Sequence, residues 1–177
     1  MEHYCVMVKS GGERAFKKDF EENLLKNGLP SSAKITFFKK KMRNSKQIEY
    51  EQTLFPGYVF MSTEKLTPQI IASAIKSKNF YHFLDSNKEI KRLQGNDCEI
   101  LSNLLKFGEV QGISKAYFDK NQKIVIKDGP LLGFEGKIVK VNRKRGRATV
   151  QINLCSNQMK FDLAFEEIKP LPDSGKS

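Results

Sequence analysis

Hydrophobic residues in the last third of the chain come in short alternating runs. Ile124 and Ile126 begin the series, residues 138–141 continue it, and Val150 and Ile152 lie in its last run. A period of two between turn residues is typical of half-buried strands. This stretch therefore predicts a small sheet of short strands, continued by a last strand at 158–163.

Glycine-containing turns separate these runs. Gly129 lies in an Asp-Gly-Pro turn, where glycine can adopt a positive φ and the following proline restricts the backbone. Gly133 and Gly136 flank an aromatic residue and predict a bulged bend. Gly146 is expected as the left-handed residue of a hairpin turn that begins at Asn142. Because no helix fits between hairpins this close, residues 119–171 are predicted to form a small antiparallel β-barrel.

The front of the chain switches between strand and helix spacing. Residues 3–8 are aromatic and β-branched and predict a strand. Phe16, Phe20 and Leu24 follow at intervals of four and predict one apolar helix face. Ser10 and Glu13 have capping-box spacing at the start of this helix, and Gly28 is expected just after its end.

The rest of the front half continues in the same way. In chain order we expect a strand at 33–42, a polar hairpin tip at 44–51, and a bend at Pro56-Gly57 with a strand after it. A helix should begin at Thr67, with Ile71, Ala74 and Ile75 facing inward. A strand at 80–84 and a helix at 96–107 should follow. Residues 1–107 are therefore predicted to be an α+β domain in which helices cover an antiparallel sheet. Residues 108–118 are predicted to be a linker, and 172–177 a disordered tail.

Composition favours a folded protein in a reducing compartment. The 177 residues are 39% hydrophobic and include 13 Phe, which is enough for a core. No apolar run is long enough to span a membrane, and the first residues do not resemble a signal peptide. The three cysteines are far apart, with neither disulfide nor zinc spacing. We expect a cytoplasmic protein with reduced thiols and with no metal or cofactor.

Charge points to an anionic partner, and the residues give no sign of catalysis. Lysine and arginine number 31 against 20 acidic residues, a net charge of +11, which suits a polyanion but is also common in lysine-rich bacterial proteins. His3 and His82 are the only histidines, and no nucleophile–base, paired-carboxylate or metal-ligand spacing accompanies them. The chain is predicted not to be an enzyme.

Three segments in order resemble the NusG family of transcription elongation factors: YCVMVKSGGERAF, LFPGYVFM and VIKDGPLLGFEGKIVKV, the last being similar to its KOW motif. The resemblance covers nearly the whole chain. It implies an N-terminal domain that docks an apolar depression on the clamp helices of the largest RNA polymerase subunit. The residues on the matching segment are Phe55, Pro56, Tyr58 and Phe60. The alternative is that members of this strand fill the domain core.

Two basic clusters are candidate nucleic-acid sites. Lys39, Lys40, Lys41 and Arg43 lie where the family's N-terminal domain approaches upstream or non-template DNA, although a solvated hairpin explains them equally well. The second set surrounds the barrel's hairpin turn and comprises Lys137, Lys140, Arg143, Lys144, Arg145 and Arg147. Arginine suits phosphate contacts and stacking on unpaired bases, whereas the alternative is again a solvated turn.

The basic turn, with GISKAYF and DGPLLGFEGKI, is similar to LoaP-type specialised members of the family. That likeness implies a monomeric, operon-specific antitermination and elongation factor whose barrel recognises a nascent RNA hairpin. One alternative is a general housekeeping factor whose barrel binds ribosomal protein S-ten or Rho. Another is a ribosome-associated KOW protein that only binds RNA. The closing segment NQMKFDLAFEEI departs from the housekeeping pattern, and residues 67–77 lack a His-Thr-Thr sequence for a second polymerase contact.

Overall fold

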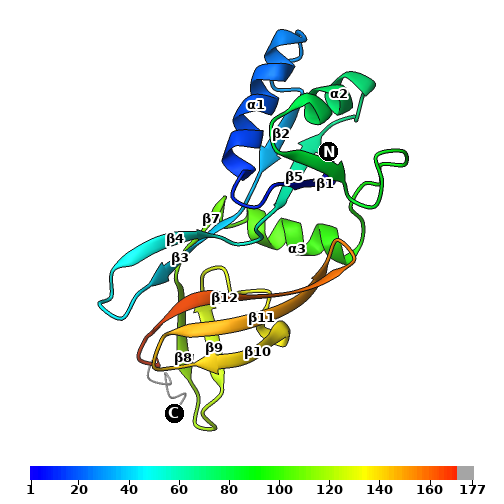
Figure 1. The fold of residues 1–177 in the computed structure, drawn as a ribbon. Helices are drawn as coiled ribbons and strands as arrows, with labels where there is room; N and C mark the ends of the chain where they lie inside the picture. Colours follow the sequence, from blue (N-terminus) through cyan, green and yellow to red (C-terminus); the bar gives the residue numbers. More distant parts are fainter. Residues whose placement is uncertain (171–177) are drawn as a thin grey trace. The chain divides into compact units, whose positions relative to one another are not determined.

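A computed structural model describes residues 1–170 and divides them into two compact units (Figure 1). The first unit contains residues 1–39, 53–102 and 154–157. The second contains residues 40–52, 103–153 and the described residues from 158 onward. The predicted tail, 172–177, and residue 171 of the predicted barrel lie outside the described residues.

The first unit is built on a four-stranded antiparallel sheet of order β2-β5-β1-β6. Its strands are β1 (Glu2–Val8), β2 (Ala33–Thr36), β5 (Tyr58–Thr63) and β6 (Phe80–Phe83). The central pair is in register from Glu2 opposite Thr63 to Met7 opposite Tyr58. The chain thus places the aromatic strand β5 between β1 and β2, in the middle of the sheet.

Helices α1 (Glu13–Lys26) and α2 (Pro68–Lys76) pack against one face of this sheet. The predicted stripe of α1 is confirmed, since Phe16, Phe20 and Leu24 are fully buried against β1 and β5 side chains. Thr67 caps α2 by accepting a hydrogen bond from the Ile70 amide at 3.3 Å. The α+β architecture of the front half is therefore confirmed.

The phase predicted for α2 is wrong by about one residue. Ile70, Ser73 and Ala74 are buried, whereas Ile75 is 48% exposed. The hydroxyl of Ser73 accepts a hydrogen bond from the Asn27 side chain at 2.9 Å. A polar residue can therefore occupy the inner face because α1 supplies its partner, and apolar spacing alone does not reveal such a partner.

The second unit contains a five-stranded sheet of order β10-β11-β12-β8-β9. Its strands are β8 (Ser114–Phe118), β9 (Ile124–Asp128), β10 (Ile138–Asn142), β11 (Arg147–Leu154) and β12 (Asn157–Glu167), with a 3-10 turn η1 (Glu135–Lys137) before β10. The predicted β-rich C-terminal region is confirmed. Its antiparallel pattern has an exception, because β12 and β8 pair in parallel, with Phe165 opposite Ser114.

A second sheet of this unit has the order β4-β3-β7. Its strands are β3 (Lys39–Arg43), β4 (Glu49–Thr53) and β7 (Val110–Gln111). We call residues 39–53 the β3–β4 hairpin. The strand expected at 33–42 is therefore two strands, interrupted at Phe37 and Phe38, and the polar tip is shorter than expected because β4 begins at Glu49.

Residues 108–118, which we expected to be a linker, contribute the strands β7 and β8. The preceding helix, α3 (Asn96–Leu105), ends close to its predicted position, and Gly108 follows with φ +80°. Ser114, at the start of β8, is fully buried, and its hydroxyl accepts a hydrogen bond from the Leu131 amide at 3.0 Å. Short strands without an apolar period are hard to recognise when their inward side chains are polar.

Glycine is needed at both predicted turns of the sheet. Gly129 has φ +96°, and a Cβ there would lie 2.6 Å from the Ser114 Cα. Gly146 has φ +60°, and a Cβ would lie 2.6 Å from the carbonyl oxygen of Phe165. Larger residues would clash with backbone atoms at either position. The turn between β10 and β11 is consequently held closely against β12.

Candidate functional site

The aromatic segment starts with a turn that a buried carboxylate holds in place. Gly57 adopts φ +84°, and its amide donates to Glu13 Oε1 at 2.7 Å. The same oxygen accepts from the Gly11 amide at 3.1 Å. Glu13 is only 3% exposed, and it is the first residue of α1 rather than the third. The predicted capping box is therefore wrong, because Gly12 occupies the N-cap and Glu13 binds across to the 56–57 turn.

The strand after this turn has two buried faces. Val59 and Met61 belong to the core under the helices. Phe60 points to the other face, where it lies opposite Cys5 and packs with Phe38 at 5.6 Å and Phe55 at 6.2 Å between ring centroids. Alternation along the strand thus separates the valine–methionine side from the aromatic side.

The predicted polymerase-contact residues differ in exposure. Phe55 is 4% exposed and Phe60 is 1% exposed, so both are core residues of this structure. Pro56 is exposed and Tyr58 is partly exposed. Of the four residues, only Pro56 and Tyr58 present surface that a partner can contact without rearrangement.

Residues 154–157 lie over the aromatic face. The Asn157 side-chain amide donates to the Tyr58 hydroxyl at 3.3 Å, and the Cys155 amide donates to Asp97 Oδ1 at 3.3 Å. Cys155 is fully buried, and its side chain is hydrogen-bonded to the Cys5 thiol. That hydrogen bond, together with burial, raises the pKa of the Cys5 thiol well above its ordinary value.

We expect the three cysteines to react at different rates with a thiol-specific reagent at pH 8. Cys98 is partly exposed, whereas Cys5 and Cys155 are buried. The raised pKa of Cys5 also favours its protonated thiol, which is less reactive than the thiolate. One thiol should be modified rapidly and two only after denaturation, with peptide mass spectrometry identifying each. A Cys98→Ser variant should lose the rapid phase. Rapid modification of Cys155 in the native protein would show that residues 154–157 leave the aromatic face readily.

The first predicted basic cluster is only partly available to a ligand. Lys40 is 9% exposed, and its Nζ donates to the Asp162 carbonyl oxygen at 2.9 Å. Burial lowers the pKa of Lys40. The negative charge of Asp162 raises this pKa in part, and the positive charge of Arg147 lowers it. Arg43 forms ion pairs with Glu49 at 3.2 Å and with Glu166 at 3.6 Å. The predicted DNA cluster on 39–43 is thus divided between buried and surface positions.

The second cluster is divided as well. Arg143 forms an ion pair with Glu167, donates to Gln122 Oε1 at 2.9 Å, and lies 4.2 Å from the centroid of the Phe118 ring. Its guanidinium holds the pKa of Glu167 below the ordinary value through their hydrogen bond. Arg143 is therefore already engaged by β8 and β12 residues.

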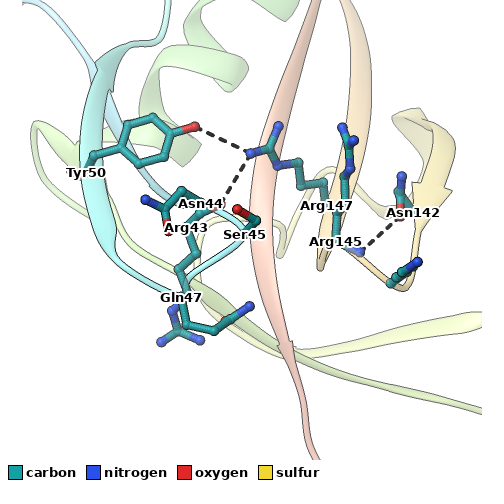
Figure 2. A pocket seen from close by; sticks show the side chains of 9 residues that line it. Arg43, Asn44, Ser45, Gln47, Tyr50, Asn142, Arg145 and Arg147 are labelled. Atoms are coloured by element: carbon teal, nitrogen blue, oxygen red, sulfur yellow. Dashed lines mark hydrogen bonds between the residues drawn. The ribbon is translucent and has the colours of Figure 1, made fainter.

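The remaining turn residues meet the β3–β4 hairpin in one pocket (Figure 2). The pocket has a volume of about 690 Å³. It is lined by Arg43, Asn44, Ser45, Gln47, Tyr50, Asn142, Lys144, Arg145 and Arg147. The structure thus brings Arg43 from one predicted set together with Lys144, Arg145 and Arg147 from the other. Lys137, in η1, and Lys140, exposed on β10, do not line it.

Sequence reasoning missed the uncharged residues of this pocket. Tyr50, Asn44 and Gln47 lie in a segment that looked like a solvated tip. A tyrosine flanked by two glutamates gives no sign by itself of a basic environment. Alternation within β4 was the available signal, because it separates the side of Tyr50 from that of Glu49 and Glu51.

The described residues contain no group of three or more potential metal-ligating side chains, and the helices among them include none that could span a membrane. His82 is exposed, and its Nδ1 lies 2.8 Å from the Phe83 carbonyl oxygen.

Comparisons with known proteins identify both halves of the chain. A family model described as transcription termination factor nusG matches residues 1–102, and a KOW-motif model matches 120–152. The NusG protein of Borreliella burgdorferi is 25% identical over 95% of this chain and 97% of its own. That of Neisseria meningitidis is 20% identical over the same shares. Both are described as transcription termination/antitermination proteins.

A solved structure concerned with domain interaction in Thermotoga maritima NusG has a related fold. It superposes with a TM-score of 0.60 and 17% identity, covering 92% of this chain and 93% of the other. This likeness extends over both units and supports the fold assignment.

Proposed function

Because the chain belongs to the NusG family of transcription termination and antitermination factors, we propose that it is an operon-specific antitermination factor. Members of this family act with RNA polymerase and are not enzymes. In the proposed mechanism, the first unit binds elongating polymerase and the basic β10–β11 turn binds nascent RNA. Binding energy, rather than chemistry, would keep the polymerase moving past a terminator.

The observation that carries this proposal is the group of cations around the pocket. Lys144 and Arg145 are exposed at the turn, Arg147 lies behind them, and no carboxylate is among the pocket-lining residues of the described chain. Such a surface attracts the phosphates of RNA and raises the rate of encounter. A housekeeping factor with a protein-binding KOW domain is the rival, and it has no need of this cluster.

The proposed polymerase contact uses the aromatic face of the first unit. Tyr58 and Pro56 offer the accessible surface, while Phe60 and Phe55 support it from beneath. Residues 154–157 cover part of this face, as the Asn157–Tyr58 hydrogen bond shows. We therefore infer that these residues must leave before the clamp helices of the polymerase can dock. Partly covered aromatic residues are suitable anchors, since they bury a large area when a partner replaces the cover.

A salt-series titration of the full chain tests the RNA part of the proposal. The probes are a panel of leader RNA hairpins and an unstructured strand of equal length. At low salt, we expect one hairpin class to bind at least about tenfold tighter than the unstructured strand. The Lys144→Ala/Arg145→Ala variant should lose that preference, because it removes two cations of the proposed RNA site. Both side chains are exposed, so the fold should remain intact.

Arg14→Gln, an exposed change of charge on α1, is the control for net charge. If every RNA binds equally weakly, and the affinity falls steeply as the salt concentration rises, the chain attracts RNA by charge and does not recognise its structure. That result would favour the housekeeping reading, in which the KOW domain binds ribosomal protein S-ten or Rho. Failure of the full chain to bind RNA polymerase would instead favour the ribosome-associated alternative.

A further inference from the structure

Arg147 is the central residue of the pocket between the β3–β4 hairpin and the β10–β11 turn. Its Nη2 donates to the Arg43 carbonyl oxygen at 3.3 Å and to the Tyr50 hydroxyl at 3.4 Å. Its Nε is buried and has no hydrogen-bond partner among residues 1–170. A guanidinium N–H without an acceptor is costly, because desolvation is not compensated. The pocket therefore contains a donor that an anionic ligand would satisfy.

Other cations line the same pocket. Figure 2 shows Arg147 between Arg145 on one side and Tyr50 on the other. Lys144 also lines the pocket, and it forms no ion pair among the described residues. Arg43 contributes a further positive charge, reduced by Glu49 and Glu166. Like charges gathered in this way repel one another, and an anion among them would remove the repulsion.

Neutral groups complete the pocket. Tyr50 is 37% exposed, and Gln47, Asn44 and Ser45 also line the pocket. Asn142 uses its Oδ1 to accept from the Arg145 amide at 3.0 Å, which leaves its amide group as a donor. The volume of about 690 Å³ lies within the range of small-ligand sites. Cations beside an accessible aromatic ring match the phosphate and base of one nucleotide.

We propose that this pocket holds an unpaired nucleotide of RNA, with its phosphate on Arg147, Arg145 and Lys144 and its base on Tyr50. The proposal rests on the RNA binding proposed above and assigns part of it to the β3–β4 hairpin. The two predicted sites, one for DNA on residues 39–43 and one for RNA on the turn, then contribute to a single site. A displaced DNA strand carries the same phosphate and base chemistry, so the test includes it.

The first experiment is a fluorescence titration of the full chain with a twelve-nucleotide oligouridylate. Tyr50→Ala should weaken binding about tenfold, because a stacked base is lost. Arg43→Gln should weaken it about threefold and reduce the salt dependence by about one counterion. Both changes are on the hairpin and leave the sequence of the β10–β11 turn unaltered, while Tyr50→Ala also removes the hydroxyl that accepts from Arg147 Nη2. Arg14→Gln removes the same charge from α1 and should have little effect.

A gain of affinity provides an independent check. Glu49→Gln removes the carboxylate that pairs with Arg43 at 3.2 Å and should tighten oligouridylate binding about threefold at low salt. An RNA duplex of equal length should bind more weakly than the single strand and should be insensitive to Tyr50→Ala, since its bases are not free to stack. A deoxyuridine strand should bind several-fold more weakly than RNA, because Gln47, Asn44 and Ser45 can bond the 2′-hydroxyl.

Photocrosslinking locates the nucleotide directly. An oligouridylate containing 4-thiouridine should crosslink to the peptide with Tyr50 and to the peptide with residues 142–147. Suppose that RNA crosslinks to the turn alone and that Tyr50→Ala and Arg43→Gln leave the affinity for RNA unchanged. This inference would then be overturned, while the proposed RNA binding would remain. No RNA binding by the full chain would overturn both. Deoxyuridine binding as tight as RNA would overturn the assignment to RNA.

Discussion

Replacing Glu13 by alanine should lower the free energy of unfolding by about 3 kcal/mol, because two backbone amides lose a charged acceptor in a buried place. The amides are those of Gly57, at 2.7 Å from Glu13 Oε1, and Gly11, at 3.1 Å. Urea unfolding followed by far-ultraviolet circular dichroism measures the change. The effect should be large for one side chain, since Gly57 stands at φ +84° and needs this anchor.

Two variants distinguish the acceptor from the helix position. Glu13→Gln keeps one acceptor oxygen and should cost about half as much as Glu13→Ala. Glu21→Ala, on an exposed position of the same helix, should change stability by less than about 0.5 kcal/mol. Equal, small losses for Glu13→Ala and Glu21→Ala would contradict the role given to the carboxylate.

Replacing Phe60 by alanine should cost about 3–4 kcal/mol, the usual range for a large aromatic core residue. The ring is 1% exposed and packs with Phe38 and Phe55 at 5.6 and 6.2 Å. Loss of polymerase binding in this variant would therefore follow from loss of the fold. Urea unfolding of the variant tests this before any binding assay.

Tyr58→Phe provides the matched surface change on the same strand. It removes only the hydroxyl that accepts from Asn157 and should cost less than about 1 kcal/mol. A Phe60→Ala protein with unchanged stability would show that Phe60 is a surface residue, as the family resemblance first suggested. Such a result would restore it to the proposed polymerase contact.

Patterns along the chain predicted most of the elements. The stripe at Phe16, Phe20 and Leu24, the cap at Thr67 and the turn at Gly146 depend on local spacing and backbone geometry, and all appear in the structure. Errors arose where a distant partner decides the local structure. Glu13 looked like half of a capping box because its real partner, Gly57, is 44 residues away.

The candidate sites were predictable as residue types but not as arrangements. Arg143 and Arg145 look equivalent in the sequence, yet Glu167 and Phe118 engage one of them and the other lines the pocket. Phe60 and Tyr58 likewise look equivalent, whereas Phe60 is buried and Tyr58 is partly exposed. Only the fold distinguishes the members of each pair, since local spacing is the same for both.

The order of segments in the two units affects how the protein can be dissected. The chain passes from the first unit to the second after residue 39 and returns to the first at residue 53. It enters the second unit again at residue 103, and residues 154–157 belong once more to the first unit. A cut near residue 107 would separate the β3–β4 hairpin from Arg147 and Asp162, which are hydrogen-bonded to Arg43 and Lys40 of the hairpin. Each half would then expose unpaired polar groups and apolar surface that the intact chain covers. Terminal truncations are therefore poor substitutes for point variants in this protein, and split fragments should recover their properties only when mixed.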